Sequence, residues 1–489
     1  MVRELVLLIA MLSPQMTPVY RAQQMNAEGI RLMQVNRPAD AEAQFRQAIQ
    51  LDPANMEAVI NLGIAIFRQG RFRESIPFFE QGVANRPQDA AVHNDLAQAY
   101  VRVGRPHDAA AEMARACDLD PKNAEYRRFL GDMLEEAGDR AAAEKQLRMA
   151  IKMAPKSAEN WLSLAKLMTK EDRRDEAAKA YERSLALNGK QPDALRELGE
   201  LHAFEGDFEE AEEEFRQAIA LDPRNAVLHA DLGSAQMKAG QKDRAEEELR
   251  KAVGLNPALG AAHRDLGLVL REKGDLEGAV RELRRAVELM PNDSTLHFQL
   301  SRTLRQAGRA KEAANEAKIS EELGRKEKAS AEALGKANQG LTLVEAGKTR
   351  QGLAMIEEAL RLDPKSLAAH FNYALALRRV KRYDDSIVQL QAVLSIEPDM
   401  PAAYYQLGFD YFKKGQYPES VSVFRRAANL IPGTAAVHNG LGVALAKTGD
   451  ANGALAELGA AVKLDPKSQL YRKNLDCLQT RATGCVLSP

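Results

Sequence analysis

The sequence predicts an all-α protein built from a tandem array of helix–turn–helix units. Three observations support this prediction. Prolines recur every 34 residues over most of the chain, small residues recur at fixed places in the same period, and each period holds two helical patterns of apolar residues. The composition agrees, because aromatic residues make up only 5% of the 489 residues while the helix formers Ala, Leu, Glu and Arg are abundant.

The charge balance excludes one class of partner. The chain has 68 basic and 69 acidic residues, which gives a net charge of -1. Such a balance offers no positive surface for non-specific binding of nucleic acid, so we expect no nucleic-acid partner. A charged fraction of 28% beside a hydrophobic fraction of 45% is typical of a folded, soluble chain. Three cysteines are too few to form a disulfide framework for a chain of this length.

Residues 1–21 have some features of a signal peptide. The apolar run Leu5–Leu12 is too short to span a bilayer but fits the core of such a peptide. Glu4 weakens the basic start, and Tyr20 and Ala22 flank a poor cleavage site. The alternative is a terminal helix that packs on its neighbour. The sequence therefore predicts an extracytoplasmic or periplasmic location, with a cytoplasmic location as the alternative and no integral membrane span.

The proline period defines the repeats. One phase comprises Pro53, Pro87, Pro121, Pro155, Pro223, Pro257 and Pro291, and after a slip of five residues a second phase comprises Pro364, Pro398, Pro432 and Pro466. Gly189 and Arg325 occupy the two in-phase places that lack proline. In the repeat over 226–257, Gly240 separates two helical patterns and Pro257 ends the second, as the backbone preferences of these residues predict.

Two places of each repeat are always small. The eighth place is occupied by Gly29, Gly63, Ala97, Gly131, Ala165, Gly199, Gly233, Gly267, Ser301, Gly340, Ala374, Gly408 and Gly442. The twentieth place is also small throughout, from Ala41 and Ser75 to Gly352 and Ala454. Small side chains at fixed places indicate that the two helices of each repeat cross closely, because a larger side chain would hold them apart.

These features, together with a frequent Leu at the seventh place, resemble the tetratricopeptide repeat family over residues 22–466. The resemblance implies a right-handed superhelical solenoid of about 13 repeats, with nine over 22–327 and four over 333–466. We expect residues 328–332 to form a helical register shift, with Lys326–Ser330 as extra turns of the ninth repeat's second helix; a surface loop is the alternative. Asn36, Asp172 and Lys381 replace the usual loop glycine. A capping helix over 467–482 and a tail over 483–489 complete the chain, since a terminal repeat needs a cover with a polar outer face.

The reactive side chains do not suggest catalysis. Six histidines share the fourth place of their repeats, namely His93, His229, His263, His297, His370 and His438. Neighbouring first helices hold them too far apart to share one metal ion, so we interpret them as structural. Cys117 fits a helix core, while Cys477 and Cys485 would form a disulfide only in an oxidising compartment. The sequence has no phosphate-binding loop, nucleophile elbow or zinc spacing, so we expect no catalytic residue, metal or cofactor.

The predicted binding surface lies on the first helices. Their fifth, ninth and twelfth places form one stripe, which lines the concave groove in this family. The stripe is polar in the fourth repeat, with Arg128, Asp132 and Glu135, but aromatic in the twelfth. A helix with two apolar faces is normally buried on both. We therefore predict an apolar groove formed by Leu341, Val344, Phe371, Leu375, Tyr405, Phe409 and Phe412. The alternative is that these side chains pack on each other or on adjacent helices.

The sequence thus predicts a non-enzymatic scaffold. It would bind a protein or an extended peptide along the groove, where apolar burial gives affinity and polar flanks set the register. The family's clamp for C-terminal carboxylates uses paired Lys and Asn residues, and the groove lacks that set. Two alternatives are a fixed subunit of an envelope assembly or export machine, and a regulatory subunit of an enzyme on another chain. The sequence leaves the oligomeric state open.

Overall fold

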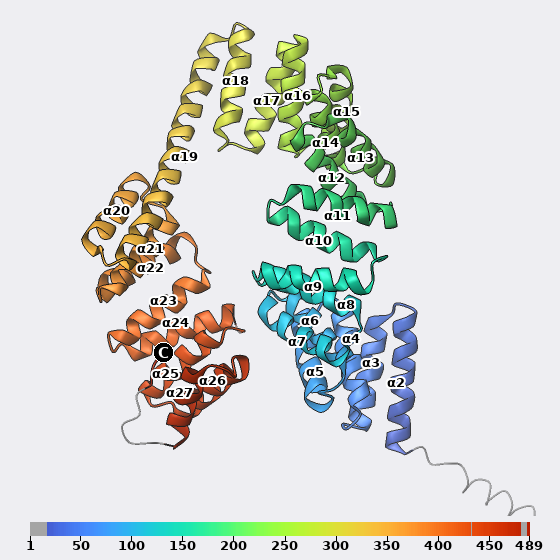
Figure 1. Ribbon diagram of the computed structural model, residues 1–489, viewed down its shortest axis with the longest axis vertical. Coiled ribbons are helices and arrows are strands. Elements are labelled where there is room, and N and C mark those ends of the chain that lie inside the picture. The colour runs from blue at the N-terminus through green and yellow to red at the C-terminus, as the bar shows by residue number, and fades with distance from the viewer. Residues whose placement is uncertain (1–16, 432, 481–486) are drawn as a thin grey trace, which may run out of the picture. The chain divides into compact units, whose positions relative to one another are not determined.

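The computed structural model describes residues 17–431, 433–480 and 487–489. These residues form 26 helices, α2 to α27, and they include no strand (Figure 1). The predicted all-α repeat fold is therefore confirmed. The packing divides the chain between Pro223 and Arg224 into two compact units, and each unit is a series of antiparallel helix pairs.

The first unit contains six helix pairs, and the second contains the remaining helices. The first unit comprises α2 (Pro18–Gln34), α3 (Pro38–Leu51), α4 (Met56–Arg68), α5 (Phe72–Asn85), α6 (Ala90–Arg102), α7 (Pro106–Leu119), α8 (Ala124–Glu136), α9 (Arg140–Met153), α10 (Ala158–Lys170), α11 (Arg174–Leu187), α12 (Pro192–Glu205) and α13 (Phe208–Leu221). The second comprises α14 (Ala226–Lys238), α15 (Lys242–Leu255), α16 (Gly260–Lys273), α17 (Leu276–Leu289), α18 (Ser294–Gln306), α19 (Ala310–Glu345), α20 (Thr349–Leu362), α21 (Leu367–Arg379), α22 (Tyr383–Ile396), α23 (Pro401–Lys413), α24 (Tyr417–Leu430), α25 (Ala435–Thr448), α26 (Ala451–Leu464) and α27 (Gln469–Thr480).

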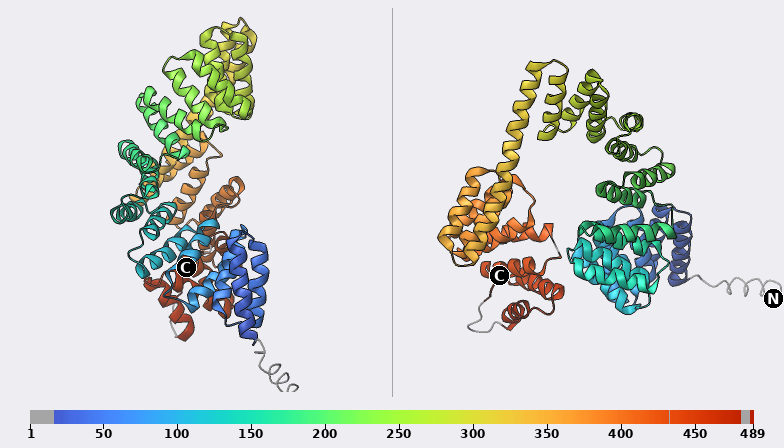
Figure 2. Two further views of the ribbon diagram at one scale, coloured as in Figure 1. Left: turned by 90° about the vertical axis from the view of Figure 1, so that its right-hand side faces the viewer. Right: turned by 45° about the horizontal axis from the view of Figure 1, so that its top comes forward.

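Within each unit every helix packs on the next helix along the chain, as two further views show (Figure 2). Several first helices also touch the first helix of the following repeat, for example α8 with α10 and α25 with α27. Each repeat therefore contacts chiefly its sequence neighbours, which is the packing of a solenoid.

The contacts at the eighth place explain why its residues are small. A Cβ atom on Gly233 would lie 2.6 Å from Cγ of Leu249, and one on Gly408 would lie 2.8 Å from the ring of Phe424. Both Leu249 and Phe424 are fully buried on the second helix of the same repeat. The absence of a side chain on the first helix therefore leaves a space, and a large side chain of the second helix fills it.

The turn inside each repeat requires a left-handed residue. Ten glycines have φ between 75° and 96°, and Asn36, Asp172 and Lys381 have φ of 55°, 58° and 61°. The three residues that replace the usual loop glycine thus take the conformation that glycine has in the other repeats. Lys has no side chain able to stabilise this conformation locally, so the surrounding helices impose it.

The slip between the two proline phases lies inside a single helix. α19 runs without interruption from Ala310 to Glu345, through Lys326–Ser330 and through Gly324 and Gly335 (Figure 2, right, yellow). Arg325 stands where a proline would end the helix. α19 packs on α18 with its first part and on α20 and α21 with its last part. One helix thus serves as the second helix of the ninth repeat and the first helix of the tenth.

Near its two ends the chain has the helices α27 and α2. α27 packs on α25 and α26 as the expected cap. Cys477 on α27 is disulfide-bonded, whereas its predicted partner Cys485 lies outside the described residues. The apolar run Leu5–Leu12 lies outside them as well. The cleavage site flanked by Tyr20 and Ala22 falls in the first turns of α2, where Ala22 is fully buried.

None of the helices in the described part of the chain combines the length and the apolar character that crossing a bilayer requires.

The close crossing of α19 and α20 predicts opposite effects for two glycine substitutions. A Cβ on Gly352 would press on the carbonyl oxygen of Gly340 and lie 2.6 Å from a methyl group of Val344, whereas a Cβ on Gly335 would meet nothing within 4 Å. Gly352→Ala should therefore destabilise the second unit by roughly 1–3 kcal/mol. Gly335→Ala should stabilise it by up to about 1 kcal/mol, because Ala loses less backbone entropy.

Urea unfolding of the full chain, followed by circular dichroism, measures both effects. Equal effects of the two substitutions would contradict the close backbone crossing.

Candidate functional site

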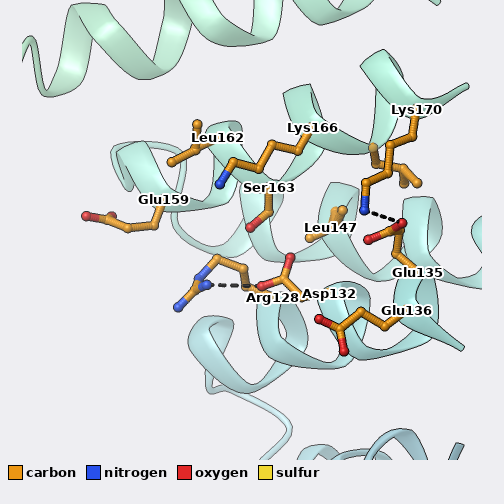
Figure 3. Close-up of a pocket in the computed structure, with 11 residues that line it drawn as sticks. Arg128, Asp132, Glu135, Glu136, Leu147, Glu159, Leu162, Ser163, Lys166 and Lys170 are labelled. Atoms are coloured by element: carbon orange, nitrogen blue, oxygen red, sulfur yellow. Dashed lines mark hydrogen bonds and ion pairs between the residues drawn. The ribbon is translucent and has the colours of Figure 1, made fainter. Parts of the chain in front are cut away.

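Two cavities adjoin on the first helices of repeats two to five. The larger has a volume of about 400 Å³ and the smaller about 230 Å³. The larger is lined by Arg128, Asp132, Glu135, Glu136, Leu147, Glu159, Leu162, Ser163, Lys166, Leu167 and Lys170 (Figure 3). The smaller is lined by Phe67, Gln98, Val101, Arg102, Phe129, Asp132, Met133 and Glu136. Asp132 and Glu136 line both cavities, so we treat them as one surface, the α4–α10 groove.

The helical period places these side chains together. Arg128, Asp132 and Glu135 occupy the fifth, ninth and twelfth places of the fourth repeat, so they project from one side of α8. Leu162 and Lys166 occupy the fifth and ninth places on α10. The predicted stripe thus lines a cavity in the fourth and fifth repeats, where the side chains are mostly charged.

Most charges in the larger cavity are paired. Arg128 lies 3.2 Å from Asp132, and Lys170 lies 2.6 Å from Glu135, as the dashed lines in Figure 3 show. Burial raises the pKa of the Asp132 carboxyl, while a hydrogen bond with Ser163 and the nearby charges of Arg128 and Lys166 oppose that rise. These four charges therefore compensate one another within the cavity wall.

Two exposed charges of the cavity remain available. Among the described residues, no carboxylate lies within 4 Å of the Lys166 ammonium and no basic group lies within 4 Å of the Glu136 carboxylate. The charge of Lys166 still acts on Asp132 from a greater distance, where it lowers the pKa of that carboxyl. Figure 3 shows the Lys166 ammonium pointing away from the Lys170–Glu135 pair. Lys166 therefore offers a partner for an acidic side chain of a ligand, and Glu136 offers one for a basic side chain.

The smaller cavity is mainly apolar. Phe67 and Phe129 are half-buried against the same core, formed by helices α5 to α8. Phe67 makes edge contacts with Phe72 and Phe79, at centroid distances of 5.0 and 6.5 Å. The guanidinium of Arg102 covers Phe72 at 4.1 Å. These contacts hold the ring of Phe67 in place, so the cavity wall is preformed.

The smaller cavity contains residues outside the predicted C-terminal groove. Phe67 and Val101 are apolar residues at the twelfth place of repeats two and three, a signal that was present in the sequence. Phe129 occupies the sixth place, outside the stripe, and only the tertiary structure brings it to the same cavity as Phe67 and Val101.

The groove predicted in the C-terminal array needs one correction. Val344 is only 4% exposed and packs in the core with Ile356 and Ala376, so it does not line an accessible surface. The close crossing at Gly340 and Gly352 turns this part of α19 toward α20. The other six predicted residues, Leu341, Phe371, Leu375, Tyr405, Phe409 and Phe412, are half-buried.

The aromatic side chains of the twelfth repeat have partners within the chain. Tyr405 lies 5.8 Å from Phe424, and Phe412 lies 5.3 Å from Tyr417, measured between ring centroids. These contacts favour the alternative that the predicted groove residues pack on adjacent helices. Leu341, Phe371 and the twelfth-repeat aromatics also belong to three separate hydrophobic clusters.

Arg378, which is paired with the buried Asp410, covers one side of Phe409. The guanidinium of Arg378 lies 4.5 Å from the Phe409 ring and its Nε lies 3.7 Å from Oδ1 of Asp410. The Asp410 side chain is fully buried and accepts a hydrogen bond of 2.5 Å from the Ser386 hydroxyl. Burial raises the pKa of Asp410 to about 6, against the opposing effects of Ser386 and Arg378.

The histidines have structural partners. Nδ1 of His93 lies 2.6 Å from a carboxylate oxygen of Glu112, and its Nε2–H donates to the carbonyl oxygen of Pro87 at 3.2 Å. His263 and His297 make the same two contacts. The partners at this spacing are Glu112, Glu248, Glu282, Glu316 and Glu457, with Gln389 facing His370. Each of the six thus contacts a side chain of the second helix, and His93, His263, His297 and His370 also contact a proline carbonyl, as expected of structural residues.

Cys117 is a buried free thiol, and burial raises its pKa to about 11, which suits the predicted core position. In the described part of the chain, no group of three or more His, Cys, Asp or Glu side chains is arranged to hold a metal ion.

Two family models match the parts of the chain that contain the repeats. The tetratricopeptide repeat model matches residues 338–401 and 405–469, and residues 22–265 match the family described as the C-terminal domain of cilia and flagella-associated protein 70. The chain is a tetratricopeptide repeat protein. A search of curated proteins finds no match.

Solved structures of tetratricopeptide repeat proteins are similar to parts of this chain. The C-terminal part of a repeat protein from Cytophaga hutchinsonii is 14% identical, with a TM-score of 0.42, over 49% of this chain and 99% of that one. PilF of Pseudomonas aeruginosa is 19% identical, with a TM-score of 0.36, over 40% and 89%. YrrB, described as a repeat protein with an unusual peptide-binding site, is 21% identical, with a TM-score of 0.33, over 38% and 95%.

The raised pKa of Asp410 predicts a specific pH dependence. Between about pH 3.8 and pH 6 the folded state keeps a proton that the unfolded state has released, so this group lowers stability as the pH rises through that window. The cost at pH 7 is about 3 kcal/mol for a shift of about two pH units. Asp410→Asn, which retains the hydrogen bond from Ser386, should raise the free energy of unfolding at pH 7 by up to that amount.

Denaturant midpoints of the wild-type chain and the variant, measured at pH 4 and pH 7, test this. The gain should shrink at pH 4, where the native carboxyl is already neutral. A gain that is the same at both pH values would contradict the buried, protonated state.

Proposed function

We propose that this tetratricopeptide repeat protein is a non-enzymatic scaffold that binds an extended protein segment in the α4–α10 groove. The observation that supports this proposal is the junction of an apolar cavity and a cavity of mixed charge, which share Asp132 and Glu136. An extended peptide would place an apolar side chain beside Phe67 and Phe129, and polar side chains beside α10.

The available charges define the chemistry of the partner. Lys166 is exposed and would pair with an acidic side chain, while Glu136, between the cavities, would pair with a basic one. The preferred ligand is therefore an extended segment with one apolar residue flanked by charges of both signs. Apolar burial supplies most of the affinity, and the charged pairs fix direction and register.

A charge reversal in the groove tests this proposal. Lys166→Glu places a further carboxylate in a cavity that already holds four, and it should weaken capture of the partner roughly tenfold. Lys179→Glu on α11 is the matched control, since Lys179 is also exposed and helical but belongs to a second helix. Both variants should keep their stability within about 0.5 kcal/mol of the wild type.

The partner would be captured with the tagged full chain, identified by cross-linking mass spectrometry, and its affinity measured for each variant. Equal loss with both variants would place binding outside the groove. Cross-links confined to the second unit would lead to the same conclusion.

We further propose that the chain is exported, on the basis of the apolar run Leu5–Leu12. N-terminal sequencing of the protein purified from its native source should find a chain that begins near residue 23. Such a chain lacks the Thr17 cap and the first turns of α2 but keeps Asn26 and Gly29, which pack in the first repeat. Recovery of intact Met1 in a cytoplasmic fraction would exclude export.

A further inference from the structure

The last residues of the chain lie on two buried asparagines of the second unit. Asn439 belongs to α25 and Asn474 to α27, and each is only 1% exposed. Figure 1 marks the C-terminus beside α25. We propose that Asn439 and Asn474 form a binding site for an extended peptide main chain, and that the chain's own residues Leu487–Pro489 occupy it. This site lies in other repeats than the α4–α10 groove, so it does not depend on the proposed function.

The hydrogen bonds all reach the main chain of one residue. The amide nitrogen of Asn474 donates to the carbonyl oxygen of Ser488 at 2.7 Å, and the backbone N–H of Ser488 donates to the amide oxygen of Asn474 at 3.2 Å. The amide nitrogen of Asn439 also donates to the Ser488 carbonyl, at 3.1 Å. One side-chain amide thus pairs with both polar groups of a residue, as a neighbouring strand does in a β-ladder.

The asparagines are held in place independently of the tail. Asn474 also donates to the amide oxygen of Asn439 at 2.7 Å, across 35 residues of sequence. The same contact recurs at the start of the chain, where Asn61 donates to Asn26 at 3.0 Å across the same number of residues. The pair therefore follows from the packing of neighbouring first helices, and it is preorganised for a ligand.

The tail contributes to the burial of this pair. Each asparagine is 1% exposed with residues 487–489 in place, and when the tail leaves, another main chain or water must supply the hydrogen bonds that the tail makes. Asn439 stands at the fifth place of the thirteenth repeat, in the stripe that the resemblance assigns to the groove. The tail thus covers a ligand-facing position of the last repeat.

The contacts define the class of ligand. Within the described residues the Ser488 hydroxyl makes no hydrogen bond, and recognition uses only its main-chain N–H and carbonyl. The site therefore accepts any extended segment that offers a free N–H and carbonyl at this position. The tail competes with such a segment at the high effective concentration of a tethered ligand, so it blocks the site until it is displaced or removed.

A peptide binding in trans tests the proposal. The probe is a synthetic peptide of residues 483–489 carrying Cys485→Ser, and saturation-transfer NMR measures its binding at millimolar concentration. The proteins are the full chain and a chain truncated after Val486. The probe should bind the truncated chain and bind the full chain at least fivefold more weakly, because the tail of the full chain already fills the site.

Two variants of the peptide separate main-chain from side-chain recognition without altering the protein. Ser488→Ala keeps both main-chain groups and should bind as the native peptide does. Ser488→Pro lacks the N–H, leaves the amide oxygen of Asn474 unpaired, and should bind roughly 5- to 150-fold more weakly. Asn474→Ala in the truncated chain should reduce binding similarly, provided its circular dichroism melt shows a folded second unit.

Equal binding to the full and truncated chains would show that the tail does not occupy the site. Equal binding of the Ser488→Pro and Ser488→Ala peptides would show that the main chain is not what is recognised. Absence of binding to the truncated chain would exclude the asparagine pair as a peptide site. Each of these results overturns the proposal.

Discussion

The close crossing of the two helices within each repeat is the constraint on which the rest of the structure depends. A small residue at the eighth place of the first helix faces a large, fully buried residue of the second, as Gly233 faces Leu249 and Gly408 faces Phe424. This contact fixes the distance between the two helices. The same contact recurs in the nine repeats that have a glycine at this place, from Gly29 with Phe45 to Gly442 with Leu458, so their helix pairs cross in the same way.

The crossing also determines which side chains are free to vary. Once one side of a first helix packs on its partner and a second side on the adjacent repeats, only the remaining stripe is left for a ligand. In repeats two to five that stripe lines cavities, with Phe67 at the apolar end, beside Phe129 from outside the stripe, and with Lys166 at the charged end. In the twelfth repeat Tyr405 and Phe412 occupy the same stripe and pack on Phe424 and Tyr417. Whether the stripe forms a cavity or extends the core is therefore decided by the side chains around it.

Polar side chains also fix how the helices and turns pack. His93, His263 and His297 each join a proline turn to a carboxylate on the second helix, so they fix the turn as well as the helix pair. The pairs of Asn26 with Asn61 and of Asn439 with Asn474 show that the same repeat geometry brings amides of neighbouring first helices together. Buried polar groups of this kind are costly unless they are satisfied, and each of these contacts satisfies them.

The sequence alone determined the repeat length, the helix pairs and the eighth and twentieth places, because these follow from short-range periodicity and from the space that a glycine leaves. It also placed Asn36, Asp172 and Lys381 at the position of the usual loop glycine, and the structure shows that all three take the left-handed conformation there.

Only the tertiary structure decided which stripe residues are accessible. Val344 and Phe412 follow the same helical spacing as Lys166, yet Val344 is buried by the glycine crossing of α19 and α20, and Phe412 is half-covered by Tyr417. The contact of Ser488 with Asn439 and Asn474 could not be predicted from the sequence either, because the spacing of these residues does not match the 34-residue repeat. Accessibility depends on the volumes of several helices at once, and a periodic pattern on one helix does not contain that information.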